Sequence, residues 1–403
     1  MRRLKDRTGL VEALCSVGLA DGRTLLASGS LNGTVRLWDP ATGTEECVLA
    51  GHSSPVAALC SVGLADGRTL LATGSHDGTV RLRDPAVGSQ KYLLEGHTDL
   101  VAALCTVGLA DGRELLASAS HDGTVRLWDP TKSNLSAGFR RYDGSITAAC
   151  SLGHADGSTL LATASSNGTI QAWDPLTGAQ EHLPLFEGHT GSFASLCEVT
   201  LADGRTLLAS ASHFGAIRLW DPASGTRVHS LKIRPGTAWC SVKLADGRTL
   251  LATGSSGGAI CLWDPATGAQ LHRTDIDAGS VRVLCSVELA DGRTLVATAS
   301  GFSDGAVRLW HPVTGTRQYM IEGSSRSTGH ATSITAVCAV KLPDGRTLLA
   351  IGSGDRTVRL WDIEGSLAAQ IPVRSVPRAL VAFDRTLAVV LASGVLAVDI
   401  ESL

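Results

Sequence analysis

Residues 123–130 read GTVRLWDP and contain the dipeptide Trp128-Asp129, which recurs along the chain of 403 residues. Two copies are altered: Arg83 replaces the Trp of the second copy, and His311 replaces the Asp of the seventh. Successive copies lie 43 to 51 residues apart, a period typical of a propeller or a solenoid. The repeats are predicted to end near residues 39, 84, 129, 174, 221, 264, 311, 362 and 399.

The second unit shows how one repeat divides into four short strands, which we call a to d in chain order. The turn after strand a contains Asp66-Gly67, where Gly accepts the positive φ of a tight hairpin turn. Pro85 ends strand c, because proline cannot donate to a ladder. The apolar pattern between these turns predicts strands at 56–64, 69–75, 79–84 and 91–94.

The order of Gly-His, Asp-Gly and Trp-Asp elements resembles the WD40 family over essentially the whole chain. The resemblance implies a hydrogen-bonded chain in each blade, formed by a His before strand a, a Ser or Thr of strand b, the Trp of strand c and an Asp of the b-to-c turn. Such a buried network rigidifies a core when every member is satisfied. Carried over to this sequence, the network comprises His97, Ser118 or Ser120, Asp122 and Trp128 in the third unit, and His330, Ser353, Asp355 and Trp361 in the eighth.

The remaining units lack at least one member of this network. Arg83 stands in the Trp position of the second unit, and Tyr142 in the His position of the fourth. Phe214 stands in the Asp position of the fifth. We therefore expect these blades to depend on apolar packing.

The repeats predict an all-β fold in which residues 1–403 form a single closed WD40-type propeller domain. A degraded ninth unit at 378–399 favours nine four-stranded blades, and residues 3–5 align with the strand d that this unit lacks. Pairing of this N-terminal strand with the last blade would close the ring and remove its open edges. The alternative is eight blades, with residues 372–403 packed as an appendage.

Charge and hydropathy argue against several classes of partner. With 35 basic and 38 acidic residues, the net charge of −3 gives no electrostatic case for nucleic acid or an anionic membrane. The apolar segment 386–398 is shorter than the roughly 20 residues of a membrane span. With no export signal, we expect a cytoplasmic protein, and 29 Arg against 6 Lys point to a high-GC, bacterial origin.

Residues capable of chemistry recur at fixed places in the repeat, as structural residues do. Eight of the ten cysteines share one slot of strand a and read as small buried residues, since no CxxC spacing supports a thiol metal site. Ser75, His76 and Asp77 are consecutive in a tight turn and cannot align as a triad. His121 and His213, in the same turn of later units, have no partner at metal-ligand spacing. We expect no catalytic residue, no cofactor and no metal.

The face with the Asp-Pro and Ala-Asp-Gly-Arg turns is nearly uniform, whereas the face with the Gly-His and b-to-c turns varies from the fourth unit onward. The variation includes a lengthened turn at 301–303 and an insertion at 323–329. Aromatic and Arg residues gathered on one face are typical of protein-contact hot spots, although random drift of loops predicts the same pattern. The candidate partner-binding residues are Arg140, Arg141, Tyr142, Phe214, Trp239, Phe302 and Arg326.

These observations predict a non-catalytic, monomeric scaffold that binds a protein or peptide partner on the variable face. Two alternatives stay open because a fold does not specify a function. One is a small-molecule or glycan-binding propeller, which requires an aromatic residue recurring at one exposed position, and no such residue recurs. The other is a sensor or regulatory module of a bacterial signalling or conflict system.

Overall fold

The computed structural model of the chain consists of antiparallel β-sheets. The described residues contain no helix of the length and apolar character that a membrane span needs. The structure describes residues 10–40, 44–109, 111–132, 135–138, 144–153, 159–177, 193–212, 216–222, 224–233, 238–275, 280–300, 305–321, 333–342, 344–383, 386–391 and 394–399.

Nine sheets are formed by the described residues, and we number them in chain order. Sheets 1 and 2 contain β1 (Val11–Gly18), β2 (Thr24–Ser30), β3 (Val35–Asp39) and β4 (Thr44–Leu49), then β5 (Val56–Gly63), β6 (Thr69–Ser75), β7 (Val80–Arg83) and β8 (Gln90–Leu94). Sheets 3 and 4 contain β9 (Val101–Gly108), β10 (Glu114–Ser120), β11 (Val125–Trp128) and β12 (Leu135–Gly138), then β13 (Ile146–Gly153), β14 (Thr159–Ser165) and β15 (Ile170–Trp173).

The later sheets repeat this pattern. Sheets 5 and 6 contain β16 (Phe193–Thr200), β17 (Thr206–Ser212), β18 (Ala216–Trp220) and β19 (Arg227–Lys232), then β20 (Ala238–Lys243), β21 (Thr249–Gly254), β22 (Ala259–Trp263) and β23 (Gln270–Asp275). Sheets 7 to 9 contain β24 (Val281–Glu288), β25 (Thr294–Ser300), β26 (Val307–Trp310) and β27 (Arg317–Ile321), then β28 (Ile334–Lys341), β29 (Thr347–Ser353), β30 (Thr357–Asp362) and β31 (Leu367–Pro372), and finally β32 (Pro377–Phe383), β33 (Thr386–Leu391) and β34 (Gly394–Asp399).

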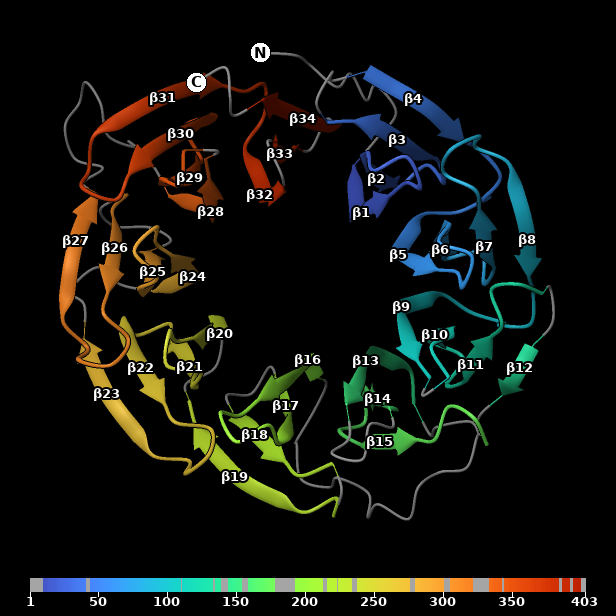
Figure 1. Ribbon diagram of the computed structural model, residues 1–403, viewed down its shortest axis with the longest axis horizontal. Helices are drawn as coiled ribbons and strands as arrows, with labels where there is room; N and C mark the ends of the chain where they lie inside the picture. Colours follow the sequence, from blue (N-terminus) through green and yellow to red (C-terminus); the bar gives the residue numbers. More distant parts are fainter. Residues whose placement is uncertain are drawn as a thin grey trace.

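The sheets stand around a common centre, with strand a of each sheet innermost and strand d, where described, outermost (Figure 1). Each sheet therefore packs between two neighbours. Strand b lies between strands a and c and is covered on both faces, so β6 is buried from Leu70 to Ser75. This explains why strand b reads as a nearly continuous apolar run.

Glycines shape the turns that join these strands. Gly67, in the turn between β5 and β6, has a φ of 82°, and Gly78, between β6 and β7, has a φ of 77°. A Cβ on Gly78 would lie 2.9 Å from the carbonyl oxygen of His97 in the next sheet. The b-to-c turn thus requires Gly both for its backbone conformation and for close approach to its neighbour.

Apolar side chains fill the space between successive sheets in a recurring arrangement. Between sheets 2 and 3, Val62 and Leu82 of one sheet pack with Leu104, Leu116 and Trp128 of the next. Leu104, Leu116 and Trp128 come from strands a, b and c, so one face of sheet 3 is directed at its predecessor.

The first and last sheets share an apolar cluster of the same kind. Leu14, Leu26 and Trp38, which occupy in sheet 1 the positions of Leu104, Leu116 and Trp128, pack with Ala388 and Val390 of sheet 9. Trp38 is 1% exposed. Sheet 9 therefore shares an apolar cluster with sheet 1, although β32 does not lie as close to β1 as it does to β28.

The strands predicted for the second unit agree with the structure to within one residue at each end. Residues 377–399 contribute a three-stranded sheet of their own, and β32 packs beside β28. Residues 3–5, the predicted closing strand, lie outside the described residues.

Candidate functional site

The third unit contains a buried chain of hydrogen bonds. The Trp128 indole Nε1–H donates to Ser118 Oγ at 2.8 Å, and Ser118 Oγ lies 2.8 Å from His97 Nε2. His97 Nδ1 lies 3.1 Å from Asp122 Oδ2. Because an ionised carboxylate only accepts, Nδ1 carries the proton, Nε2 accepts from Ser118, and every member is satisfied. The serine of the chain is Ser118, whereas Ser120 Oγ donates to the carbonyl of Asp99.

The environment of this chain sets the ionisation of its members. Burial would raise the pKa of Asp122, but hydrogen bonds from Thr124 and from the Thr98 backbone N–H outweigh it and lower that pKa to about 2. Burial lowers the pKa of His97, and the charge of Asp122 offsets this only in part. His97 is therefore neutral near pH 7 and serves as a structural residue.

The second unit keeps the His and Asp but replaces the Trp. His52 lies 2.8 Å from Thr73 Oγ1 and 3.0 Å from Asp77 Oδ2. Arg83 is 4% exposed, and its guanidinium donates to the carbonyl of Ala50 at 2.6 Å. The arginine thus replaces the indole with a different hydrogen bond to the segment before His52.

A shorter form of the network persists elsewhere, where the strand c Trp donates to a hydroxyl of strand b. In sheet 6, Trp263 Nε1 lies 3.0 Å from Thr253 Oγ1. The corresponding pairs are Trp38 with Ser28, Trp173 with Thr163, Trp220 with Ser210, and Trp310 with Thr298.

The eighth unit departs from the predicted network. Trp361 pairs with Leu349 in the register that Trp128 makes with Leu116, which places Ile351 at the position of Ser118. Ser353 is the last residue of β29, and its hydroxyl accepts from the Asp355 N–H at 3.3 Å. The Trp361 Nε1 is buried without a hydrogen bond among the described residues. Ser353 therefore does not accept from the Trp361 indole, because the strand position that faces the indole holds Ile351. The rest of the predicted network stays a prediction, since His330 lies outside the described residues.

The recurring cysteines of strand a lie between neighbouring sheets. Cys60, for example, packs against the cluster between sheets 2 and 3. Burial raises the pKa of Cys60 to about 12, and it raises the pKa of Cys285 to the same value. These thiols stay protonated near pH 7 and are poor nucleophiles and metal ligands. The described part of the chain contains no group of three or more metal-ligating side chains.

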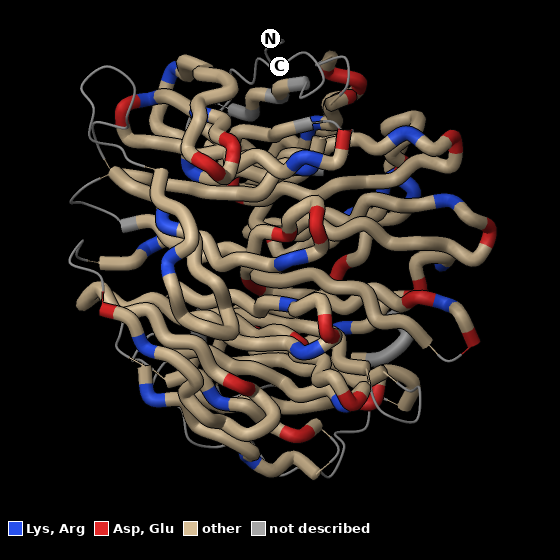
Figure 2. Tube along the Cα trace, turned by 60° about the vertical axis from the view of Figure 1, so that its left-hand side comes forward, with Lys and Arg blue, Asp and Glu red and all other residues tan. Residues whose placement is uncertain are grey.

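Charges on the outer surface are mixed in sign (Figure 2). The turns between strands a and b contribute to this mixture, because most of them place an Arg two residues after an Asp. Arg68 Nη2 lies 2.7 Å from Asp66 Oδ2, and both side chains are about half exposed. Such pairs add little stability and cancel each other's field.

The inner wall, formed by strand a of each sheet, divides into two unlike halves. The last residue of strand a is Gly in sheets 1 to 4 and Thr, Lys, Glu and Lys in sheets 5 to 8. The larger residues are Thr200, Lys243, Glu288 and Lys341. At the opposite end of the same strands, the exposed residues are Glu12, Arg282 and Arg378 in sheets 1, 7 and 9, where sheets 2 and 3 have Ala57 and Ala102.

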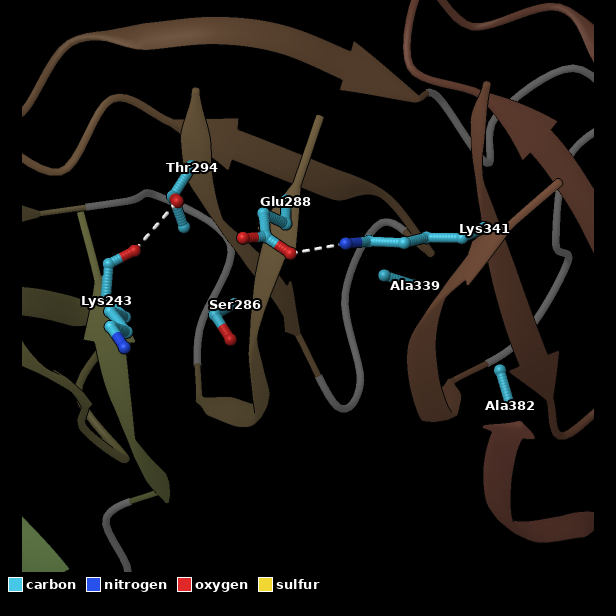
Figure 3. A pocket seen from close by; sticks show the side chains of 7 residues that line it. All are labelled: Lys243, Ser286, Glu288, Thr294, Ala339, Lys341 and Ala382. Carbon is cyan, nitrogen blue, oxygen red and sulfur yellow. Dashed lines mark hydrogen bonds and ion pairs between the residues drawn. The ribbon is translucent and has the colours of Figure 1, made fainter. Parts of the chain in front are cut away.

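Two hollows lie on the charged half of this wall. The inner pocket, about 590 Å³, is lined by strand a of sheets 5 to 8, including Trp239 and Cys285. The rim pocket, about 510 Å³, lies beside the a-to-b turns and is lined by Lys243, Glu288 and Lys341 (Figure 3). The two hollows share Ser286 and Ala339 in their linings, so they are adjacent.

Comparison with known families agrees with the repeat geometry. The family model described as WD domain, G-beta repeat matches three times, at residues 5–39, 43–84 and 88–129. The chain belongs to the WD40-type repeat family. A second family model, described as outer membrane protein assembly factor BamB, matches residues 213–401. No curated protein matches the sequence.

Solved structures show how widely this WD40-type fold is shared. The computationally designed Ika8 protein resembles the chain with a TM-score of 0.56 and 21% sequence identity, covering 99% of this chain and 100% of that one. In all, 1677 chains of solved structures match. A fold used so often does not identify a partner.

Among the candidate partner-binding residues of the WD40-type repeats, the structure describes Trp239. It lies on β20 in the wall of the inner pocket, and its Nε1–H donates to Ser195 Oγ at 3.1 Å. Trp239 thus faces the inside of the ring rather than an outer turn. The other candidates lie outside the described residues: Arg140, Arg141, Tyr142, Phe214, Phe302 and Arg326.

The turn sequences did not predict the charged rim formed by Lys243, Glu288 and Lys341. The a-to-b turns are nearly identical in sequence, so their face looked uniform. The residue just before each turn differs, and the signal was present in Lys243, Glu288 and Lys341, which replace Gly at the end of strand a. On the face with the a-to-b turns, the turn sequences are therefore nearly uniform, whereas the last residue of strand a varies from sheet to sheet.

Proposed function

We propose that this WD40-type chain is a non-catalytic interaction platform that binds a protein or peptide on the face formed by the Gly-His and b-to-c turns. The observation that supports this proposal is that the repeats differ at the start of strand a. Glu12, Arg282 and Arg378 are exposed there. Sheets 2 and 3 have alanine there. Charged side chains around one opening give a partner both orientation and a faster encounter.

The chemistry of the described residues supports binding rather than catalysis. His52 and His97 have pKa values lowered by burial. Both are buried, and their ring nitrogens form hydrogen bonds within the blade. The cysteines of the inner wall have pKa values raised by burial. Groups that would serve as bases or nucleophiles are thus committed to structure.

We also propose that the nine sheets form one closed propeller, a single domain of residues 1–403. Two observations support closure: the apolar cluster that joins sheet 9 to sheet 1, and the open fourth position of sheet 9, which has three described strands. Residues 3–5 would occupy that position and pair the start of the chain with its end. An eight-bladed ring would leave the apolar residues of β33 without cover.

The platform is tested by affinity capture and mass spectrometry with matched charge reversals. The double variant Arg282→Glu, Arg378→Glu is compared with the wild type and with Lys132→Glu, an exposed site on the outer circumference. We expect a partner that the wild type and Lys132→Glu recover and the double variant does not. Equal recovery by all three proteins would contradict binding at this opening, and a glycan-array signal without a protein partner would favour the glycan-binding alternative.

A further inference from the structure

The rim pocket is built from the ends of three neighbouring strands. Lys243, Glu288 and Lys341 end β20, β24 and β28, and all three side chains are exposed. The Lys341 ammonium pairs with the Glu288 carboxylate across the boundary between sheets 7 and 8 (Figure 3). This pairing lowers the pKa of Glu288, so the carboxylate is ionised near pH 7.

Lys243 has a different position in the pocket. Its ammonium makes no hydrogen bond or ion pair within the described part of the chain, and Figure 3 shows it apart from the Glu288–Lys341 pair. The exposed hydroxyl-bearing residue Ser286 lies in the same pocket, on the neighbouring strand. A cation and a hydroxyl group therefore line the pocket; the charge of Lys243 contributes to the lowered pKa of Glu288, but the Glu288 carboxylate is paired with Lys341.

The backbone beneath these side chains is held by the next sheet along. Thr294 Oγ1 donates to the carbonyl of Lys243 at 2.8 Å, and Thr347 Oγ1 donates to the carbonyl of Glu288 at 2.9 Å. Both threonines are buried. The strand ends are thus held at fixed positions, and a rigid site loses less entropy when a ligand binds.

The charge balance of the pocket favours one class of ligand. Two lysines and one glutamate leave a single positive charge. A single carboxylate neutralises that charge, whereas a phosphate, with nearly two negative charges, exceeds it and is repelled more strongly by Glu288. On the other side of Ser286 lies the adjacent inner pocket, where Trp239 and Leu284 offer apolar contacts.

We propose that the rim pocket binds an acidic peptide segment of a protein partner, with one carboxylate between Lys243 and Ser286 and the adjoining residues directed toward Trp239. This site lies at the end of strand a opposite Arg282 and Arg378, so it is separate from the platform proposed above. A volume of about 510 Å³ suits a few side chains rather than a folded domain.

The competing explanation is that the Lys-Glu-Lys series only joins neighbouring sheets. An exposed ion pair adds little stability, and Lys341 and Glu288 are 65% and 61% exposed. A purely structural series also gives no reason for the Lys243 ammonium, which makes no hydrogen bond or ion pair in the described part of the chain and acts on Glu288 only through its charge.

The test uses the full chain and a fluorescein-labelled peptide in which one glutamate is followed by leucines, with binding followed by fluorescence anisotropy. Lys243→Met keeps the aliphatic stem and should weaken binding about fivefold. Glu288→Gln removes the repelling charge, releases Lys341 and should strengthen binding by a similar factor. Lys132→Met, at an exposed lysine that pairs with Asp129 on the outer circumference, should leave the affinity unchanged.

Thermal unfolding of each variant separates binding from structure. We expect unchanged unfolding midpoints together with the opposite shifts in affinity. The proposal is overturned if Lys243→Met and Lys132→Met bind equally, or if Glu288→Gln weakens binding. It is also overturned if inorganic phosphate at matched ionic strength displaces the peptide, because the site would then prefer a free phosphate.

Discussion

Sheets 2 and 3 differ from sheets 6 to 8 in where their polar residues lie. Sheets 2 and 3 place polar side chains inside the sheet, in the His52 and His97 networks, and the ends of their inner strands have only Ala or Gly. Sheets 6 and 7 each retain one hydrogen bond, from the strand c Trp to a strand b Thr. Sheet 8 lacks this bond because Ile351 occupies the position of the hydroxyl residue. Their inner strands end in Lys243, Glu288 and Lys341.

Within one repeat, the residues that stabilise the sheet and the residues that determine the surface charge therefore occupy different positions. The networks lie in positions that neighbouring sheets cover, where an unpaired polar group is costly. The strand ends face open space, as at Gly108, where an added Cβ would touch nothing within 4 Å. Charged residues can enter such positions without disturbing the packing.

The largest expected effect concerns the junction of the ring. Trp38→Ala should lower the free energy of unfolding by about 4 kcal/mol, as much as Trp128→Ala, because a buried Trp is lost in both. Trp38 is 1% exposed and Trp128 2%. Urea unfolding of the two variants measures this.

The outcome bears on closure because the two tryptophans differ in their setting. Trp128 lies between two consecutive sheets, whereas Trp38 contacts the last sheet of the chain. A cost for Trp38→Ala of less than half that for Trp128→Ala would show that sheets 1 and 9 separate in solution. Deletion of residues 1–8 should also lower stability if these residues supply the fourth strand of sheet 9.

A smaller effect should separate a complete network from a reduced one. Ser118→Ala leaves the Trp128 indole and His97 Nε2 without a partner and should cost about 3 kcal/mol in free energy of unfolding. Thr253→Val leaves only the Trp263 indole unpaired and should cost about 1 kcal/mol. Urea unfolding again provides the measurement, and equal costs would mean that the His97 branch adds nothing.

The smallest effect is a local response to acid. The pKa of His97 is lowered in the folded chain, so its neutral form contributes stability above the ordinary pKa near 6.5, and that stability is lost as the pH falls below it. The pKa of Asp122 is about 2, so its contribution is present above the ordinary value of 3.8 and is lost between about pH 4 and pH 2.

Amide hydrogen exchange, corrected for its intrinsic pH dependence, can detect the first step. From pH 7 to pH 5, β10 should lose protection relative to β21, because Thr253, the β21 side chain at the position of Ser118, pairs with the Trp263 indole and not with a histidine. His97→Gln is the control, since it removes the titrating group and should abolish the pH-dependent difference. An unchanged difference in that variant would assign the effect to another group.

The sequence predicts the repeating part of this molecule well, because the features of each strand are local. Asp66-Gly67 and Pro85 mark turns by their backbone chemistry, and the strands of the second unit lie where these turns place them. In the eighth unit, the link between Ser353 and Trp361 is not formed, for a related reason. Ser353 and Ile351 are two residues apart on one strand, and only the pairing with β30 shows which of them faces Trp361.

The sequence by itself determined the all-β repeat, its period and its WD40-type character, since these follow from turn residues and apolar spacing that each unit carries alone. The tertiary structure decided what lies at the centre of the ring. Lys243, Glu288 and Lys341 are about 50 residues apart in the chain and become neighbours only when their strands stand side by side. Their proximity depends on packing between sheets, a long-range property that no single repeat encodes.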